Sequence, residues 1–266
     1  MDVVIIGSGN IAYSLTFALK NSSSTNLLQI CSRGSHRGLE LASRVEVEHI
    51  SSYEKLKKAH LYIVCVSDSV QCEVQKKVAE FVDSNAIIAH TSGAIAVENG
   101  DNFARFYPLQ TFTYGVEADF KKITIFVEAN SLENEKKLIT LANIIAKGGE
   151  KIDADTLKVV HLAATFANNF TNRMFHYAET ILQRVDIDRS VLYPLMEESV
   201  AKIERTDKAV RLLQSGAAAR GDISTINSHL ELIANMGKGE DSKGDNGSEM
   251  EEIYQIITKA IYNDKF

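Results

Sequence analysis

The chain has 266 residues, of which 45% are hydrophobic and 24% are charged, and its formal net charge at pH 7 is −6. This composition is ordinary for a globular protein that is long enough for two domains. The acidic balance and the lack of a long basic run argue against nucleic acid as a partner, and no apolar run reaches the length of a membrane span. The three cysteines lack metal-ligand spacing, so we expect a reduced, cytoplasmic protein with no metal site and no cleaved leader.

The first predicted element is a buried strand, the apolar run Val3–Ile6, which leads into a glycine-rich turn and a helix. The turn reads Gly7-Ser8-Gly9-Asn10-Ile11-Ala12, and a second apolar run at residues 27–31 closes a βαβ unit. G-x-G-x-x-A in this position is the fingerprint of dinucleotide binding, because the first glycine permits a tight turn and the second admits a pyrophosphate. The helix start attracts the anion with its N–H groups and its dipole. We therefore predict that residues 7–11 bind a dinucleotide. The alternative is an ordinary glycine-rich turn between a strand and a helix.

The residues after the second predicted strand indicate which dinucleotide is bound. NAD-preferring sites usually carry Asp or Glu at this position, where the carboxylate holds the ribose 2′-hydroxyl. This chain carries Ser32 and Arg33, whose hydroxyl and guanidinium can hydrogen-bond a 2′-phosphate instead. The sequence thus predicts NADP(H) rather than NAD(H), with Ser32 and Arg33 as main contacts and His36 and Arg37 as secondary ones. The alternative is that all four are solvated loop residues.

Strand and helix signals alternate up to about residue 150, which predicts a largely parallel, doubly wound sheet. Further strands are expected at residues 45–50, 61–66, 86–90, 103–107 and 123–127, with a helix over 70–81. In such sheets ligands bind outside the carboxyl ends of the strands. We therefore expect the residues at the ends of two strands to face the cofactor. They are Val66, Ser67, Asp68, Thr91 and Ser92.

From residue 153 onward the pattern is helical. Helices are expected at residues 155–185, 190–213, 222–236 and 249–262, with a polar loop at 237–248. The fold class is therefore α/β: a Rossmann NADP-binding domain over residues 1–152, then an all-helical substrate and dimerisation domain over 153–266. The apolar faces of the first two helices are large for so small a domain, which favours a homodimer. In reductases of this organisation the active cleft lies between the two domains.

Three segments resemble one family. Residues 107–112, Tyr-Pro-Leu-Gln-Thr-Phe, resemble its H-P-L-Q-T-F segment, and residues 161–169 resemble its H-A-A-x-x-x-A-x-N helix. Residues 215–230 resemble its T-G-P-x-x-R-G-D-x-x-T-V-x-x-H-L block, with Ala217 in place of Pro. On these segments the chain is similar to the Rossmann-like DUF2520 family, which resembles pyrroline-5-carboxylate reductases and NADP oxidoreductases of the coenzyme F420-dependent type. The resemblance implies the fold and the cofactor. Tyr107 departs from the family's usual His, so a proton-transfer role of that His does not carry over.

Two residues of the helix expected at residues 155–185 are candidates for catalysis. His161 can orient a substrate or exchange a proton near neutral pH. On a regular helix Asn168 shares its face, whereas Asn169 is rotated by roughly 80°. The resemblance favours Asn169. We predict His161 and Asn169 as catalytic, with Asn168 as the rival, and a hydrogen bond that merely locks two helices as the alternative.

A second candidate group lies where a loop enters the helix at residue 222. Arg220 and the N–H groups of the helix start could bind a substrate carboxylate or phosphate. Asp222 could take part in that site, or it could simply cap the helix or pair with Arg220. Thr225 and His229 are four residues apart and share one face of this helix. Gln110 and Thr111 follow a strand end, where they could meet the nicotinamide carboxamide or the substrate.

The sequence therefore favours an NADP(H)-dependent oxidoreductase that transfers a hydride to or from a small anionic C=O or C=N substrate in the cleft between the domains. The chemistry of hydride transfer belongs to the nicotinamide, and the protein orients the substrate and handles a proton. The alternative is a non-catalytic dinucleotide-binding sensor or regulatory protein. A deazaflavin partner of the F420 type is a third possibility.

Overall fold

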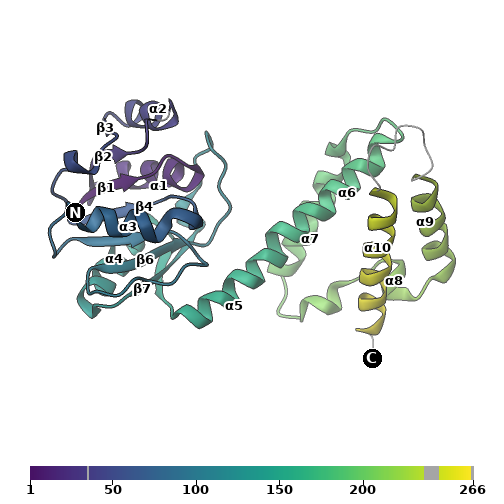
Figure 1. Ribbon diagram of the computed structural model, residues 1–266. Coiled ribbons are helices and arrows are strands. Elements are labelled where there is room, and N and C mark those ends of the chain that lie inside the picture. Colours follow the sequence, from purple (N-terminus) through teal and green to yellow (C-terminus); the bar gives the residue numbers. More distant parts are fainter. Residues whose placement is uncertain (35, 237–245, 265–266) are drawn as a thin grey trace. The chain divides into compact units, whose positions relative to one another are not determined.

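The computed structural model describes residues 1–34, 36–236 and 246–264. The chain divides into two compact units, Met1–Phe170 and Thr171–Phe266, which we call the sheet unit and the helical unit (Figure 1). The first helix beyond residue 152 belongs to the sheet unit, because Leu157 is fully buried in a cluster with Tyr107 and Ile152. None of the described helices is long and apolar enough to cross a membrane.

The described part of the sheet unit forms one sheet in the order β3-β2-β1-β4-β5-β6-β7-β8. Neighbouring strands are parallel except β6 and β7, which are antiparallel. The strands are β1 (Asp2–Ile6), β2 (Asn26–Cys31), β3 (Glu48–Ile50), β4 (Leu61–Val64), β5 (Ile87–His90), β6 (Phe103–Pro108), β7 (Thr124–Ala129) and β8 (Gly148–Lys151). The predicted α/β Rossmann sheet is confirmed.

Two of the strand expectations need correction. The strand expected at residues 45–50 is shorter, because Val45 already belongs to the apolar core beside helix α2 and Glu46 adopts a positive φ of 55°. Strand β8 was not expected at all. It lies at the edge of the sheet with exposed or half-buried residues, so its sequence, Gly-Gly-Glu-Lys, carries no apolar run.

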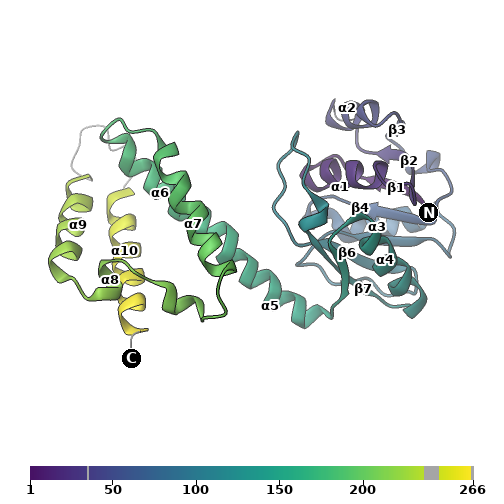
Figure 2. The ribbon, with the colours of Figure 1, turned by 180° about the vertical axis from the view of Figure 1, so that it is seen from behind.

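Helices cover both faces of the sheet, which is why the central strands are apolar at consecutive positions rather than at alternate ones. Val3 and Ile5 of β1 face a core shared with α1 (Asn10–Lys20), α2 (His36–Arg44) and α4 (Leu132–Ile145). Val4 and Ile6 face the opposite core, which includes Val78 of α3 (Gln71–Ala79). Figure 2 shows the same layers from behind. Helix α5 (Ala154–Ala164) follows β8.

The helical unit contains α6 (Thr171–Gln183), α7 (Tyr193–Glu204), α8 (Ala217–Arg220), α9 (Ile223–Met236) and α10 (Asn246–Asn263). Tyr177, Ile233 and Met250 form a small core among α6, α9 and α10. Helices α9 and α10 lie side by side in both views (Figures 1 and 2). The expected helices at 222–236 and 249–262 are therefore confirmed. Of the polar loop expected at 237–248, residues 237–245 lie outside the described residues.

The other two expected helices are each interrupted. The helix predicted over residues 155–185 contains a π-helical turn at Thr165–Phe170, between α5 and α6. The helix predicted over 190–213 ends at Glu204. Just beyond that end, the Thr206 hydroxyl accepts a hydrogen bond from the backbone N–H of Lys208, a local contact that competes with the helical pattern.

Candidate nucleotide-binding site

The glycine-rich turn after β1 contains two glycines that are required for different reasons. Gly7 has a φ of +124°, and a Cβ at this position would overlap the backbone carbonyl of Cys65 on the neighbouring segment. A side chain is therefore excluded by the protein itself. Around Gly9 a Cβ would meet no atom within 4 Å, so the fold alone does not demand a glycine there. No side chain caps the start of α1, which leaves the first N–H groups of the helix available to an anion.

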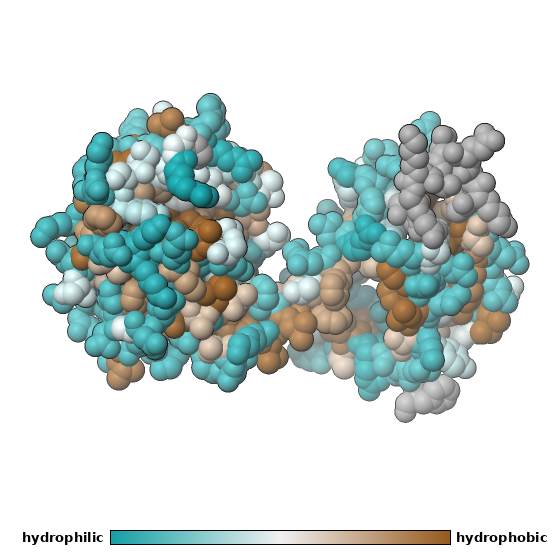
Figure 3. Space-filling view, in the orientation of Figure 1, coloured by the Kyte–Doolittle hydropathy of each residue, from teal (hydrophilic) through white to brown (hydrophobic). Residues whose placement is uncertain are grey.

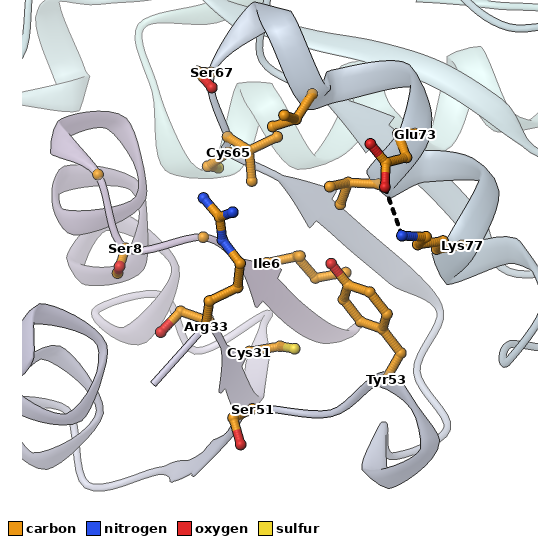
Figure 4. A pocket seen from close by; sticks show the side chains of 16 residues that line it. Ile6, Ser8, Cys31, Arg33, Ser51, Tyr53, Cys65, Ser67, Glu73 and Lys77 are labelled. Atoms are coloured by element: carbon orange, nitrogen blue, oxygen red, sulfur yellow. Dashed lines mark hydrogen bonds and ion pairs between the residues drawn. The ribbon is translucent and has the colours of Figure 1, made fainter. Parts of the chain in front are cut away.

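A cavity of about 490 Å³ opens at the carboxyl ends of β1, β2 and β4, beside this turn (Figure 4). Seven of the predicted cofactor contacts line it: Gly7, Ser8, Gly9, Ser32, Arg33, Val66 and Ser67. The remaining wall is formed by Ile6, Cys31, Ser51, Tyr53, Cys65, Val70, Glu73, Val74 and Lys77. Burial raises the pKa of the Cys31 thiol to about 11 and that of Cys65 to about 12, so both stay protonated near neutral pH. Residues that are far apart in the sequence thus converge on one site.

The basic residue predicted to recognise an additional phosphate points into this cavity. Figure 4 shows the Arg33 guanidinium directed toward Cys65. None of the ion pairs among the described residues includes Arg33. The second cation of the wall, Lys77, is paired with Glu73 at 2.5 Å. This pair lowers the pKa of Glu73 and raises that of Lys77, so the two charges balance each other. Arg33 is therefore the residue that gives this cavity a positive charge not neutralised by an ion pair.

Ser32 is positioned more tightly than the sequence suggests. Its side chain is buried, and its hydroxyl oxygen lies 2.9 Å from Nε2 of His49. Gly38 at the start of α2 makes room for this contact, because a Cβ there would overlap the Ser32 hydroxyl. Arg37 lies outside the cavity wall, with its guanidinium 4.6 Å from the ring centre of Tyr114.

Five predicted cofactor contacts do not line the cavity: Asn10, Ile11, Asp68, Thr91 and Ser92. The Asn10 amide instead donates to the carbonyl of Phe112 at 2.9 Å, which ties the loop after β6 to the start of α1. The Ser92 hydroxyl accepts from the N–H groups of Ala94 and Ile95, each at 3.1 Å, and so stabilises its own loop. Sequence reasoning missed Tyr53 and Lys77, which lie on segments without a recognisable motif.

Tyr107 and His161 form a second polar feature of the sheet unit. The Tyr107 hydroxyl oxygen, at the end of β6, lies 3.1 Å from Nδ1 of His161 on α5. Gly93 packs against both, since a Cβ there would lie 2.9 Å from Nδ1 and 3.0 Å from the tyrosine Cζ. Burial raises the pKa of Tyr107, and the nearby Asp68 carboxylate adds to the shift while Arg105 opposes it. The predicted site residues Asp68 and His161 are thus both neighbours of Tyr107.

The π-helical turn changes the expected relation between His161 and the two asparagines. The regular helix predicted here is wrong, and with it the geometric argument for Asn168. A π turn holds more residues than an α turn, so side chains after its start are rotated back relative to a regular helix. Asn169 is thereby moved toward the face of His161. Both asparagines are exposed, and the Asn168 amide donates to the Asn169 oxygen at 2.9 Å.

In the helical unit, Asp222 caps a helix, which is one of the alternatives that the sequence left open. Its carboxylate accepts from the backbone N–H of Thr225 at 3.1 Å and from the Thr225 hydroxyl at 2.8 Å. These bonds lower its pKa. Arg220 donates to the carbonyl of Ser215 at 2.6 Å and lies 4.0 Å from Asp222. His229 Nδ1 lies 2.9 Å from the hydroxyl of Tyr254 on α10, a contact that joins two helices.

A row of polar residues crosses the sheet of the sheet unit, with His90 and Arg105 buried and Glu128 half-buried. His90, Arg105 and Glu128 are register partners on β5, β6 and β7, and Arg105 pairs with Glu128 at 3.3 Å. Burial, with the charge of Arg105 nearby, lowers the pKa of His90 to about 3. The imidazole is therefore neutral in the folded protein at neutral pH. Among the described residues, no group of three or more His, Cys, Asp or Glu could hold a metal ion.

Comparisons with known proteins agree with this architecture. Residues 123–261 match the family described as "Domain of unknown function (DUF2520)", and residues 1–82 match the family described as "Oxidoreductase family, NAD-binding Rossmann fold". The sequence matches none of the curated proteins.

Solved structures similar to this chain include a "putative NADP oxidoreductase" from Bacteroides fragilis, with 31% identity, a TM-score of 0.86 and 98% of each chain covered. An imine reductase from Myxococcus stipitatus in complex with NADP+ has 15% identity and a TM-score of 0.65, with 98% of this chain and 95% of that chain covered. Pyrroline carboxylate reductase from Plasmodium falciparum, with NADP bound, has 12% identity and a TM-score of 0.63, with 98% of each chain covered. The last two structures resemble this chain in fold only.

Proposed function

We propose that this chain, which belongs to the DUF2520 family, is an NADP(H)-dependent oxidoreductase acting on a small anionic substrate with a C=O or C=N bond. The observation that carries the proposal is the cavity at the strand ends, where the open position at Gly9 and the guanidinium of Arg33 face the same space. The solved structures of similar fold that contain NADP support the choice of cofactor.

The residues of the cavity fit a dinucleotide. The space that a Cβ at Gly9 would fill, beside the uncapped start of α1, suits a diphosphate held by backbone N–H groups. Arg33 would hold the 2′-phosphate of NADP, because a guanidinium binds phosphate through paired hydrogen bonds. Ser32, bonded to His49, would donate its hydroxyl proton at the same end. When bound, the nicotinamide supplies or accepts the hydride.

The proton that accompanies hydride transfer would be handled by His161. A histidine can exchange a proton near neutral pH, and this one is exposed at the end of the sheet where ligands of doubly wound folds bind. Asn169, rotated toward the same face by the π turn, would hydrogen-bond the substrate. Arg220 in the helical unit remains the candidate for the anionic group, with Asp222 fixing the helix start beside it.

We further propose that the protein is a homodimer formed through the helices beyond residue 152. Figure 3 shows hydrophobic side chains at the surface of the helical unit. In its described part only Tyr177, Ile233 and Met250 are buried hydrophobic residues, a core too small for the apolar surface that remains. A second copy of this chain offers the same apolar surface and would cover it isologously.

The proposal is tested by measuring NADPH oxidation, from its absorbance, against a panel of keto acids and imino acids. We expect turnover with at least one anionic member of the panel and little with its uncharged ester or amide. Tight NADPH binding without turnover across the panel would instead support the non-catalytic sensor. Absence of binding to either pyridine nucleotide would contradict both.

A further inference from the structure

Tyr107 and His161 are held together by three separate parts of the sheet unit. Tyr107 is 9% exposed and is the last residue but one of β6, while His161 lies on the exposed surface of α5. Their side chains meet through the hydroxyl oxygen and Nδ1, 3.1 Å apart, with the rings in an edge-to-face arrangement. Gly93, in the loop after β5, leaves no room for a side chain beside this contact. The buried tyrosine is therefore the fixed partner, and the histidine is the exposed one.

The contact with Tyr107 involves Nδ1 of the imidazole and does not involve Nε2. Among the described residues no hydrogen bond is formed by Nε2, so this atom is the one available to a ligand. A hydroxyl both donates and accepts hydrogen bonds, so Tyr107 can donate to Nδ1 of the neutral ring and accept from Nδ1–H of the protonated ring. The tyrosine can therefore stay bonded to His161 in both protonation states.

We propose that Tyr107 is a positioning residue, whose hydroxyl holds His161 so that Nε2 is the atom that exchanges a proton with the substrate. This inference rests on the proposed function. In the reducing direction the Nε2–H bond breaks and an O–H or N–H bond forms on the substrate, while its carbon accepts the hydride of the reduced nicotinamide. His161 enters this step protonated on both nitrogens, and it is left neutral with its remaining proton on Nδ1, which donates to the tyrosine oxygen. The exposed ring then regains a proton from water.

Tyr107 itself is poorly suited to give up the proton. Its burial and the neighbouring Asp68 carboxylate both raise its pKa, which disfavours a tyrosinate. The hydroxyl proton therefore stays on the tyrosine oxygen near neutral pH. A role in orienting the imidazole needs only that hydrogen bond.

The direct test is the tautomer of His161 in the protein without nucleotide, measured from ¹⁵N chemical shifts of labelled histidine at a pH where the ring is neutral. We expect the Nε2–H tautomer to predominate in the wild type, because Nδ1 accepts from Tyr107. In Tyr107→Phe, which keeps the ring, we expect the Nδ1–H form to rise several-fold. Phe126→Leu is the matched control, because Phe126 packs in the same cluster without bonding His161, and it should leave the tautomers unchanged. Equal tautomer populations in wild type and Tyr107→Phe would overturn the inference.

Kinetics provide an independent readout on any substrate found. Tyr107→Phe should lower kcat by roughly ten- to a hundredfold with little change in the KM for NADPH, since misplacing a general acid affects the proton step. Tyr107→His, whose ring can also donate a hydrogen bond, should recover part of the loss. In a His161→Gln background the Tyr107→Phe change should cost nothing further. An additive loss would contradict positioning through His161. If no substrate is turned over, the proposed function fails, while the tautomer measurement still decides the tyrosine contact.

Discussion

The sheet with its covering helices, residues 1–152, and the helices beyond it differ in how much of their apolar surface they bury. The first region has apolar cores on both faces of the sheet, and few large hydrophobic side chains remain exposed: Leu39, Phe81, Val116, Leu132 and Ile144. Beyond residue 152, α5 and the π turn expose Val159, Leu162, Phe166 and Phe170, and the helical unit exposes many more. The first region therefore covers most of its apolar surface with its own helices, whereas the second leaves a large apolar surface exposed, the surface that the proposed homodimer would cover.

The largest effect that we expect is on dimerisation, and it is tested by substituting one exposed leucine in each region. Leu195 on α7 and Leu132 on α4 are 65% and 68% exposed, so neither has a packing role within the chain. We expect Leu195→Glu to weaken dimerisation by roughly a hundredfold, about 3 kcal/mol, because a carboxylate would have to be buried in an apolar interface. Leu132→Glu should leave the oligomeric state unchanged. Sedimentation velocity across protein concentrations measures both.

A monomeric wild type at micromolar concentration would contradict the dimer. Equal effects of the two glutamates would contradict the distinction between the regions.

The next prediction separates the folding and binding roles of the two glycines in the first turn. Gly7→Ala should lower the free energy of unfolding by at least about 2 kcal/mol, because the new Cβ meets the Cys65 carbonyl at a strained φ. Gly9→Ala should cost less than about 1 kcal/mol, since its Cβ meets nothing in the protein. It should nevertheless weaken NADPH binding by roughly ten- to a hundredfold, because it occupies the space for the diphosphate.

Denaturant unfolding and calorimetric titration provide the two measurements. If Gly9→Ala bound NADPH like the wild type, the diphosphate would not lie where we place it.

A third prediction concerns the neutral imidazole in the core of the sheet, whose effect at any one pH unit is small. The folded pKa of His90 is lowered to about 3, whereas an unfolded histidine titrates near its ordinary value of about 6.5. The contribution to stability is therefore complete above pH 6.5 and is lost as the pH falls from 6.5 toward 3, by at most about 1.4 kcal/mol per pH unit. His90→Asn, which keeps an acceptor for the Ser92 N–H but does not titrate, should flatten this slope in denaturant unfolding. The exposed His176→Asn should not, and an unchanged slope in His90→Asn would refute the assignment.

The two regions also differ in how far their sequences predict them. The strand, glycine turn and helix of residues 2–20 could be predicted because each depends on neighbouring residues: an apolar run, a glycine pattern and a helical spacing. The position of Arg33 beside the cavity could also be predicted, because it depends only on Arg33 following the second apolar strand. Strand β8 could not, because an exposed edge strand needs no apolar residues. The π turn was missed because nothing in the spacing of Thr165–Phe170 departs from an α-helix.

The Tyr107 contact shows a further limit of prediction from sequence. The two partners are separated by 54 residues, and they meet only because Leu157 packs α5 onto the end of β6. The sequence marked His161 as a candidate and Tyr107 as a departure from a family pattern. Only the packing of α5 against β6 shows that Tyr107 is the hydrogen-bond partner of His161.

The most direct test of the central claim is a calorimetric titration of NADPH and NADH into the wild type, Arg33→Ala and Arg37→Ala. Arg37 is the matched control, because its guanidinium rests on the Tyr114 ring outside the cavity wall. We expect the wild type to bind NADPH at least roughly tenfold more tightly than NADH, since a charge-assisted hydrogen bond contributes about 1.5–3 kcal/mol. Arg33→Ala should lose that preference and Arg37→Ala should keep it. Equal affinity of the wild type for both nucleotides, or binding of neither, would contradict the account.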